Sequence, residues 1–247
     1  YGRPGAGCLS KITREAIKNI YFPASLFRDR PDVVHAHYGF SGYDFLFFRK
    51  LFGIPLVTTF YGFDVDMLPQ EDPRWLARYQ RLFAEGDLFL VEGSVMKSRL
   101  VMRGCDEKKV VVQHLGDDLE KIRFEPRAFR AGEPLGILLS GSFREKKGFP
   151  YAIEAIGRFH ARRPEVNLKV TIVGDSNGQP RDEREKRRII DAVKAGGLEP
   201  FVEYLGYQPH DVFIRELYKH HIFLSPSVTA LDGDTEGGAP VSIIEAS

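Results

Sequence analysis

Residues 135–148 read LGILLSGSFREKKG, and this stretch decides the fold class that the sequence predicts. A largely apolar run predicts a buried strand at 135–140, Gly141 permits a tight turn, and a basic loop leads through Gly148 into an apolar helical stripe at 149–161. Strand, glycine turn and helix in this order are typical of a Rossmann-like α/β unit, in which neighbouring strands run parallel.

The same alternation of strands and helices continues on both sides of this stretch. A linker at 129–134 separates two series, which predicts an α/β protein of two Rossmann-like domains with parallel sheets facing a cleft, at 1–128 and 135–247. The expected strands are 32–36, 55–60, 87–91, 109–113, 135–140, 168–173, 201–205 and 222–225, and the expected helices are 41–52, 73–85, 94–103, 149–161, 181–195 and 210–219.

Composition narrows the class of protein. The chain has 247 residues, of which 43% are hydrophobic and 28% charged, as in ordinary soluble domains. A net charge of +1 offers no global field for nucleic acid, so no nucleic-acid partner is expected. Cys8 and Cys105 lack metal-ligand spacing, which favours a reducing cytoplasm. No apolar run reaches the ~20 residues of a membrane-spanning helix.

The two series also look incomplete. The first lacks an opening strand and glycine loop, and the second lacks its closing units. We therefore expect the chain to be a fragment of a longer protein whose site is cut at its edge.

The basic loop after the strand at 135–140 has the composition of a phosphate-binding site. Backbone N–H groups near Gly141 and the start of the next helix attract an anion, which Arg144, Lys146 and Lys147 neutralise. The alternative is a set of solvated surface lysines, and both interpretations stay open. The phosphate loop of nucleotide hydrolases is excluded because G-x-x-x-x-G-K-[ST] is absent.

Residues 230–245, ALDGDTEGGAPVSIIE, place Glu236 and Glu245 around a Gly-Gly-Ala-Pro turn. A carboxylate beside such a turn accepts hydrogen bonds from vicinal hydroxyls, and exposed backbone N–H groups hold an anion. A ligand that offers both sugar hydroxyls and phosphate is a nucleotide sugar.

Further candidate residues follow other predicted strands. Gly62 permits a bend that leaves Tyr61 and Asp64 at the cleft mouth, where open α/β sheets bind ligands. Gly174 and Asp175 form either an ordinary turn or a close backbone approach to a base or ribose.

Metal binding has weaker support. His35 and His37 face one side of a strand but have no third ligand of persuasive spacing. The Asp-x-Asp patterns at 64–66 and 232–234 can bind a divalent cation on a diphosphate, although so short a pattern arises often by chance. No metal site is expected.

Taken in order, these pieces resemble the family 4 retaining glycosyltransferases of GT-B fold, across nearly all the chain from Asp32 to Ser247. The variant looks similar to bacterial enzymes of colanic-acid-type and other exopolysaccharide synthesis. The matching stretches are DVVHAHYG, TTFYGFDV, EGSVMKSRL, HLGDDLEKIRF, GSFREKKGF, IVGD, VEYLG, LSPS and DTEGGAPVSIIEA.

The resemblance implies roles for matching residues. Lys147 would neutralise the donor diphosphate and Glu236 would face the donor sugar, with Arg144 replacing the arginine that the family carries where this chain has Ser142. The family also usually has histidine at Tyr61. The expected donor-binding residues are Gly141, Ser142, Gly174, Asp175, Gly237, Gly238 and Glu245, the last holding the ribose, and those on the acceptor side are Tyr61, Gly62, Asp64, His114 and Asp118.

The resemblance further implies retaining transfer of a hexosyl group from a UDP- or GDP-sugar to a saccharide or lipid-linked acceptor, without a metal or other cofactor. Peripheral contact with the inner face of the cell membrane through Lys11, Arg14 and Lys18 is a further expectation. The alternatives are a nucleotide-sugar 2-epimerase or a phosphorylase of the same fold, and a non-catalytic nucleotide-sugar-binding module.

Overall fold

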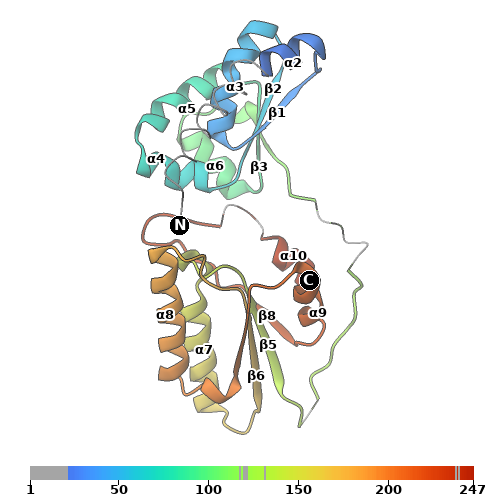
Figure 1. Ribbon diagram of the computed structural model, residues 1–247, viewed down its shortest axis with the longest axis vertical. Coiled ribbons are helices and arrows are strands. Elements are labelled where there is room, and N and C mark those ends of the chain that lie inside the picture. The colour runs from blue at the N-terminus through green and yellow to red at the C-terminus, as the bar shows by residue number, and fades with distance from the viewer. Residues whose placement is uncertain (1–21, 117, 119–121, 131, 237, 239) are drawn as a thin grey trace, which may run out of the picture. The chain divides into compact units, whose positions relative to one another are not determined.

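A computed structural model describes residues 22–247, except 117, 119–121, 131, 237 and 239 (Figure 1). The chain divides into two compact units, Tyr1–Gln113 and His114–Ser247. Each unit holds a parallel four-stranded sheet, which confirms the predicted α/β fold class. The predicted domain limits at residues 128 and 135 stay predictions, and the stretch 114–134 groups with the second unit.

The first unit is built on strands in simple chain order, β1-β2-β3-β4. Because the strands are parallel, each crossover returns over the sheet, and the helices cover its apolar side chains. The elements are α2 (Phe22–Arg28), β1 (Val34–His37), α3 (Gly39–Phe52), β2 (Leu56–Phe60), η2 (Phe63–Met67), α4 (Leu68–Glu71), α5 (Arg74–Glu85), β3 (Leu88–Val91), α6 (Ser94–Met102), η3 (Glu107–Lys109) and β4 (Val110–Val112).

An aromatic cluster fills the core of the first unit. Phe60 at the end of β2 lies 5.6 Å from the ring of Tyr79 on α5, and Phe83 lies 5.5 Å from Phe89 on β3. All four side chains are at least 95% buried. Edge-to-face pairs of this kind add about 0.5–1.5 kcal/mol each to the burial of apolar area, so α5 is fixed firmly on the sheet.

The second unit has the strand order β7-β6-β5-β8. The chain builds outward from β5 to β7 and then returns to place β8 on the other side of β5, so the crossover direction reverses between β5 and β8. The elements are β5 (Leu135–Ser140), η5 (Glu145–Lys147), α7 (Phe149–Arg162), β6 (Leu168–Val173), α8 (Pro180–Ala195), η6 (Glu199–Phe201), β7 (Val202–Gly206), α9 (His210–Leu217), β8 (Ile222–Leu224) and α10 (Val241–Ala246).

Successive side chains of β5 point to opposite faces of this sheet and pack in two different cores. Ile137 and Leu139 belong to the core under α7 and α8, whereas Leu138 belongs to a smaller core with Phe213 of α9 (Figure 1). This alternation places helices on both faces, as in doubly wound folds.

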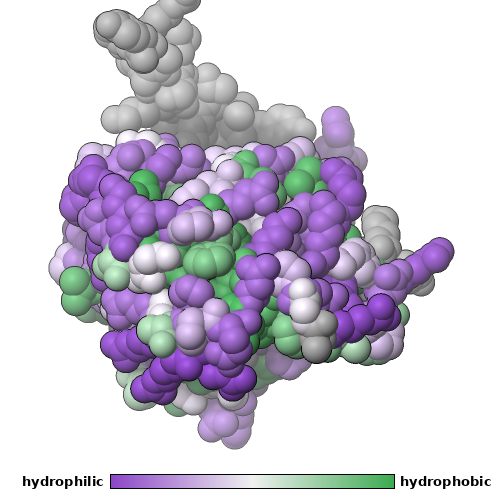
Figure 2. Space-filling view, turned by 90° about the horizontal axis from the view of Figure 1, so that it is seen from below, coloured by the Kyte–Doolittle hydropathy of each residue, from purple (hydrophilic) through white to green (hydrophobic). Residues whose placement is uncertain are grey.

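The outer surface follows the usual distribution of polarity. Figure 2 shows one face on which hydrophilic side chains predominate and surround hydrophobic ones near the middle. Over the described part of the chain, every helix is too short or too polar to cross a bilayer.

Candidate functional site

The carboxyl ends of β5 and β8 mark the point in the second unit where an open α/β sheet binds ligands. The backbone is closely packed there. A Cβ atom on Gly174, at the end of β6, would lie 1.9 Å from the carbonyl oxygen of Gly141, and its φ of +128° also disfavours other residues. Gly174 is therefore required for the ends of β5 and β6 to approach each other, whereas a Cβ on Gly141 would meet only the side chain of Lys147, at 3.4 Å. The role of both glycines as donor contacts stays a prediction.

The basic loop after β5 is bound to a second loop, residues 228–236, which follows β8. The backbone N–H of Val228 donates to the carbonyl of Lys146 at 2.9 Å. The N–H of Leu231 donates to Oε2 of Glu145 at 3.3 Å. The two loops are thus joined by backbone as well as by side chains, and the 228–236 loop lies against η5.

Opposite charges meet along this contact. Nη2 of Arg144 lies 2.5 Å from Oδ2 of Asp234, and Nζ of Lys146 lies 3.4 Å from its Oδ1. Nζ of Lys147 lies 3.1 Å from Oε2 of Glu236. The structure therefore brings together Arg144, Lys147 and Glu236, which the sequence predicts as catalytic. Such a cluster can bind a phosphate if the carboxylates give up their cations.

Asp234 was predicted only as part of a short metal-binding pattern. Its side chain is 3% exposed and shared by two cations, so it acts here as an internal counter-ion of the basic loop. The signal in the sequence was the match of opposite charges between REKK at 144–147 and DGDTE at 232–236. Across the described residues, no group of three or more His, Cys, Asp or Glu side chains could hold a metal ion.

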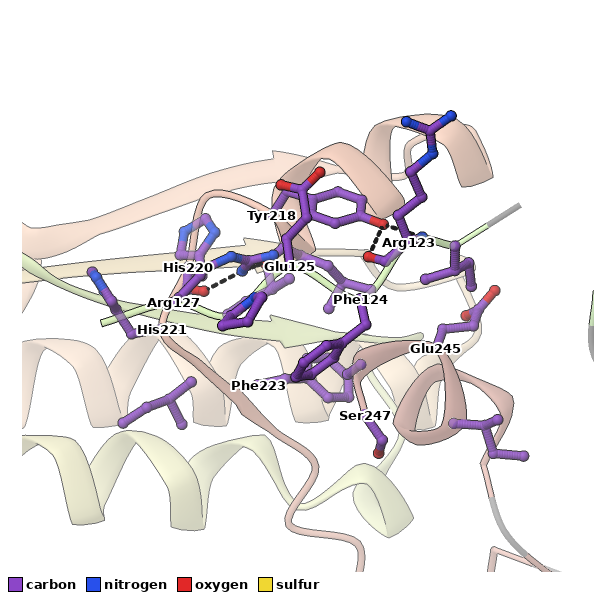
Figure 3. Close-up of a pocket in the computed structure, with 17 residues that line it drawn as sticks. Arg123, Phe124, Glu125, Arg127, Tyr218, His220, His221, Phe223, Glu245 and Ser247 are labelled. Carbon is purple, nitrogen blue, oxygen red and sulfur yellow. Dashed lines mark hydrogen bonds between the residues drawn. The ribbon is translucent and has the colours of Figure 1, made fainter. Parts of the chain in front are cut away.

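Glu245 occupies a different place from the Lys147–Glu236 pair. It lies on α10 with 7% exposure, and its Oε1 contacts Nε2 of His210 at the start of α9. It also lines a cavity of about 830 Å³ along β8, whose wall includes Phe223 and Arg127 (Figure 3). Its role at the ribose stays a prediction. Gly237, the neighbouring predicted contact, lies outside the described residues.

Asp175 lies beyond Gly174, in the turn after β6. Its Oδ1 lies 2.7 Å from Nζ of Lys186 and accepts a hydrogen bond from the N–H of Ser176 at 2.7 Å. Burial, the largest single effect, raises the pKa of Asp175. The hydrogen bonds from Lys186 and Ser176 and the positive charge of Lys186 together outweigh burial, so the pKa is lowered overall. This carboxylate is therefore ionised and already engaged.

Asp64, predicted at the cleft mouth, is fully buried. Its Oδ2 accepts from the N–H of Gly39 at 2.7 Å and its Oδ1 from the N–H of Tyr61 at 2.9 Å. Burial, the largest effect, raises the pKa of Asp64 to about 6 against these hydrogen bonds. Through these two hydrogen bonds Asp64 connects the loop after β2 to the start of α3. A contact between Asp64 and the acceptor substrate stays a prediction.

The other acceptor-side residues are more open. Gly62 has a φ of +99°, which allows the bend into η2. Tyr61 is partly exposed, and its hydroxyl contacts Nδ1 of His37. His114 and Asp118 are exposed residues after β4.

Tyr38 was not singled out from the sequence. Its φ of +70° is rare for a residue with a side chain, and its ring lies 4.9 Å from that of Tyr61. Strained backbone of this kind gathers at functional sites.

Comparison with known families gives matches on both units. Residues 9–121 match the model of Glycosyltransferase Family 4, and residues 134–247 match that of Glycosyl transferases group 1. The first match extends eight residues past the boundary between the units, and the two matches together account for most of the chain.

Curated relatives agree with these matches. WcaL of Escherichia coli (strain K12), provisionally described as a colanic acid biosynthesis glycosyltransferase, is 34% identical over 88% of this chain and 51% of its own length. The amylovoran biosynthesis glycosyltransferase AmsK of Erwinia amylovora is 31% identical over 87% of this chain and 50% of its own length. The chain thus spans about half the length of these relatives.

A solved structure supports the fold. Anabaena HepE, crystallised in complex with UDP, has a TM-score of 0.69 and 14% identity over 87% of this chain and 57% of that chain. At this identity the likeness shows the fold alone, which is the GT-B fold that the sequence predicts.

Proposed function

Since the chain belongs to the glycosyltransferases of Family 4 and group 1, we propose that it acts in the transfer of a hexosyl group from a nucleoside diphosphate sugar to a saccharide or lipid-linked acceptor during exopolysaccharide synthesis. The observation that carries this proposal is the Lys147–Glu236 pair, which joins the loop after β5 to the loop after β8. WcaL and AmsK support the polysaccharide context, and a UDP- or GDP-sugar is the proposed donor.

The proposed chemistry is electrostatic. When the anomeric C–O bond breaks, negative charge develops on the leaving diphosphate, and preorganised cations stabilise that charge in the transition state. Lys147, in the loop after β5, is the proposed cation. We propose that no metal or other cofactor takes part and that the configuration of the sugar is retained.

Glu236 is proposed to face the donor sugar. Its Oε2 accepts a hydrogen bond from Lys147, and its Oε1 is buried, accepts no hydrogen bond from any residue in the described ranges and lies 3.6 Å from Nζ of Lys146. Binding of the diphosphate would draw Lys147 away and leave the carboxylate of Glu236 available to sugar hydroxyls. The same lysine would thus couple donor binding to the release of Glu236.

The test measures nucleoside diphosphate released from UDP- and GDP-sugars by the protein in its full natural length, with EDTA present and with mixed lipid-linked acceptors added or omitted. We expect release from one donor class, and loss of more than about 100-fold in Lys147→Ala, as for removal of a main electrostatic group. Lys194→Ala, which removes an exposed lysine of α8, is the matched control. Release that is abolished by EDTA, or unaffected in Lys147→Ala, would refute the mechanism.

One observation favours a second candidate, a non-catalytic module that binds nucleotide sugars. The arginine expected at Ser142 is absent, and Arg144, its proposed substitute, is held by Asp234. In that case UDP or GDP would bind measurably in calorimetry while no donor is turned over with any acceptor. Location in the cytoplasm, at the inner face of the cell membrane, is likewise a proposal, and the basic residues at 11, 14 and 18 lie outside the described residues.

A further inference from the structure

The first unit carries a row of neighbouring aromatic rings, of which only Tyr61 was predicted as a site residue. The ring centroid of Tyr61 lies 4.9 Å from that of Tyr38. Tyr38 lies 5.2 Å from Phe40 on α3, and Phe40 lies 6.4 Å from Trp75 on α5. Tyr43 on α3 ends the row, 6.0 Å from Trp75. These five residues, here called the aromatic row, are joined ring to ring across two helices that pack against each other.

The aromatic row is partly open to solvent. Tyr38 is 40% exposed, and the other four members are partly exposed. Tyr43 and Trp75 also pack against the core of the first unit, so the fold fixes part of each ring while the rest stays accessible. Fixed aromatic surface that remains in contact with solvent is typical of a binding surface.

The backbone at Tyr38 is not explained by the fold alone. Tyr38 has a φ of +70° and a ψ of 142° directly before α3, a conformation that favours glycine. Every other residue with a positive φ in the described part of the chain is a glycine. A smaller residue would therefore suit this turn better, and the position of the ring in the aromatic row accounts for the tyrosine.

Hydrogen-bonding groups lie at both ends of the aromatic row. At one end the guanidinium of Arg78 lies 4.6 Å from the ring centroid of Trp75 and 5.7 Å from that of Tyr43. Arg78 makes no ion pair with any residue that the structure describes, so its N–H groups are available to a ligand oxygen. At the other end the hydroxyl of Tyr61 contacts Nδ1 of His37.

This combination of groups selects the chemistry of the ligand. A pyranose has apolar C–H faces that can pack on aromatic rings and hydroxyls that both donate and accept hydrogen bonds. A nucleic-acid strand also stacks on aromatic rings, but it needs a groove of several cations. Over the described rings of the row lie only Arg78 and Arg81, and Nε of Arg81 is paired with Glu85 at 2.7 Å. An acyl chain would leave the guanidinium of Arg78 without a partner.

We propose that the aromatic row binds an oligosaccharide segment of the acceptor. Successive pyranose units pack against its rings, and Arg78 donates hydrogen bonds to sugar oxygens. A row of five rings is longer than one sugar, so several units bind and affinity increases with the length of the chain. The proposal rests on the proposed function, because it takes the bound chain to be the acceptor whose reacting end lies near Tyr61.

The test measures binding of D-glucose, cellotetraose and maltotetraose to the protein in its full natural length, without donor. Binding is followed by NMR through the indole N–H signal of Trp75, which is identified by its loss in Trp75→Phe. We expect at least one tetrasaccharide to bind tenfold or more tightly than glucose. Phe40→Leu and Arg78→Gln should each weaken that binding threefold or more. Phe47→Leu, which changes a 63% exposed ring of α3 outside the aromatic row, is the matched control and should bind as the wild type does.

Stability separates binding from folding. Asparagine tolerates a positive φ better than tyrosine does, so Tyr38→Asn should keep or raise the melting temperature while it weakens tetrasaccharide binding. Arg78→Gln leaves the packed rings unchanged and tests the row even if Phe40→Leu unfolds. Absence of binding by both tetrasaccharides, equal affinity for glucose, or equal binding by Phe40→Leu, Arg78→Gln and Phe47→Leu would overturn the proposal.

The proposed function is measured in the same preparation, as nucleoside diphosphate released from the donor by the wild-type protein. Release without tetrasaccharide binding would refute the aromatic row as a saccharide site and leave the transferase standing. Tetrasaccharide binding without release from any donor would refute the transferase, and with it the identity of the bound chain as acceptor.

Discussion

Replacing Asp64 by asparagine should change how the stability of the first unit depends on pH. Asp64 is fully buried, and burial, the largest effect, raises its pKa from 3.8 to about 6. A shift of about two units corresponds to about 3 kcal/mol between the ionised and neutral forms. Asp64→Asn keeps the size of the side chain and removes the ionisation.

The sign follows from linkage. A carboxyl group whose folded pKa is raised contributes stability that is fully present below its unfolded pKa, near 4, and is lost as the pH rises through about 6. Asparagine cannot ionise, so Asp64→Asn does not lose this stability as the pH rises. The free energy of unfolding of the variant, relative to the wild type, should therefore rise by about 2–3 kcal/mol between pH 4 and pH 8.

A second effect does not depend on pH. Oδ1 and Oδ2 of Asp64 both accept backbone hydrogen bonds, from Tyr61 and Gly39, whereas asparagine offers one acceptor. The variant therefore leaves one backbone N–H unpaired, at a cost of about 1–3 kcal/mol. This cost lowers the free energy of unfolding of the variant by the same amount at every pH. The ionisation of Asp64 in the wild type determines how the difference between the two proteins changes with pH.

The assay is urea unfolding at a series of pH values, followed by tryptophan fluorescence. Trp75 is the only tryptophan in the chain, and its ring lies 5.6 Å from that of Tyr79, whose hydroxyl donates to the carbonyl of Asp64. Asp32→Asn, an exposed carboxyl of the same unit, provides the control. A difference between wild type and Asp64→Asn that stays constant from pH 4 to pH 8 would refute the reasoning.

Further predictions concern the second unit and the buried thiol. Gly148→Ala would place a Cβ 2.0 Å from a carbonyl oxygen and should cost at least about 2 kcal/mol more in thermal unfolding than Gly197→Ala, which has a similar φ and open space; equal losses would contradict this. Burial raises the pKa of Cys105 to about 11, so native-state alkylation at pH 8, followed by peptide mass mapping, should be much slower than in urea; equal rates would count against a buried thiol. Asp234→Asn frees two cations and should lower the dissociation constant of UDP about three- to tenfold in calorimetry, whereas weaker binding would show that Asp234 positions the cations instead.

The sequence predicts the regular part of the fold well, because its signal is local. Apolar runs of strand length and amphipathic runs of helix length alternate, and each predicted strand from 32–36 to 222–225 overlaps an observed one. The short elements were not predicted. The π-helical turn η2 depends on the φ of Gly62 and on the hydrogen bonds of Asp64 to distant backbone, which no local pattern reveals.

In the candidate site, the individual motifs were recognisable from the sequence, whereas most contacts between them were not. The basic loop and the glutamate turn were recognisable separately, and the structure brings Lys147 and Glu236 together. The pairing of Arg144 with Asp234 joins residues 90 positions apart, which composition and spacing do not specify. Asp64 was expected at the cleft mouth, but it is buried. Its burial depends on Tyr79 and other residues distant in sequence, so no local pattern predicts it.

The return of the chain from β7 to β8 has a consequence for folding order. In the first unit each strand pairs with the next one along the chain, so that sheet can form as synthesis proceeds. In the second unit Ile137 of β5 pairs with Ile222 of β8, which is synthesised much later. The two strands can pair only when the long segment between them brings its ends together. Contacts this distant in sequence slow folding, so we expect β8 to join β5 only after the intervening strands β6 and β7 have been synthesised.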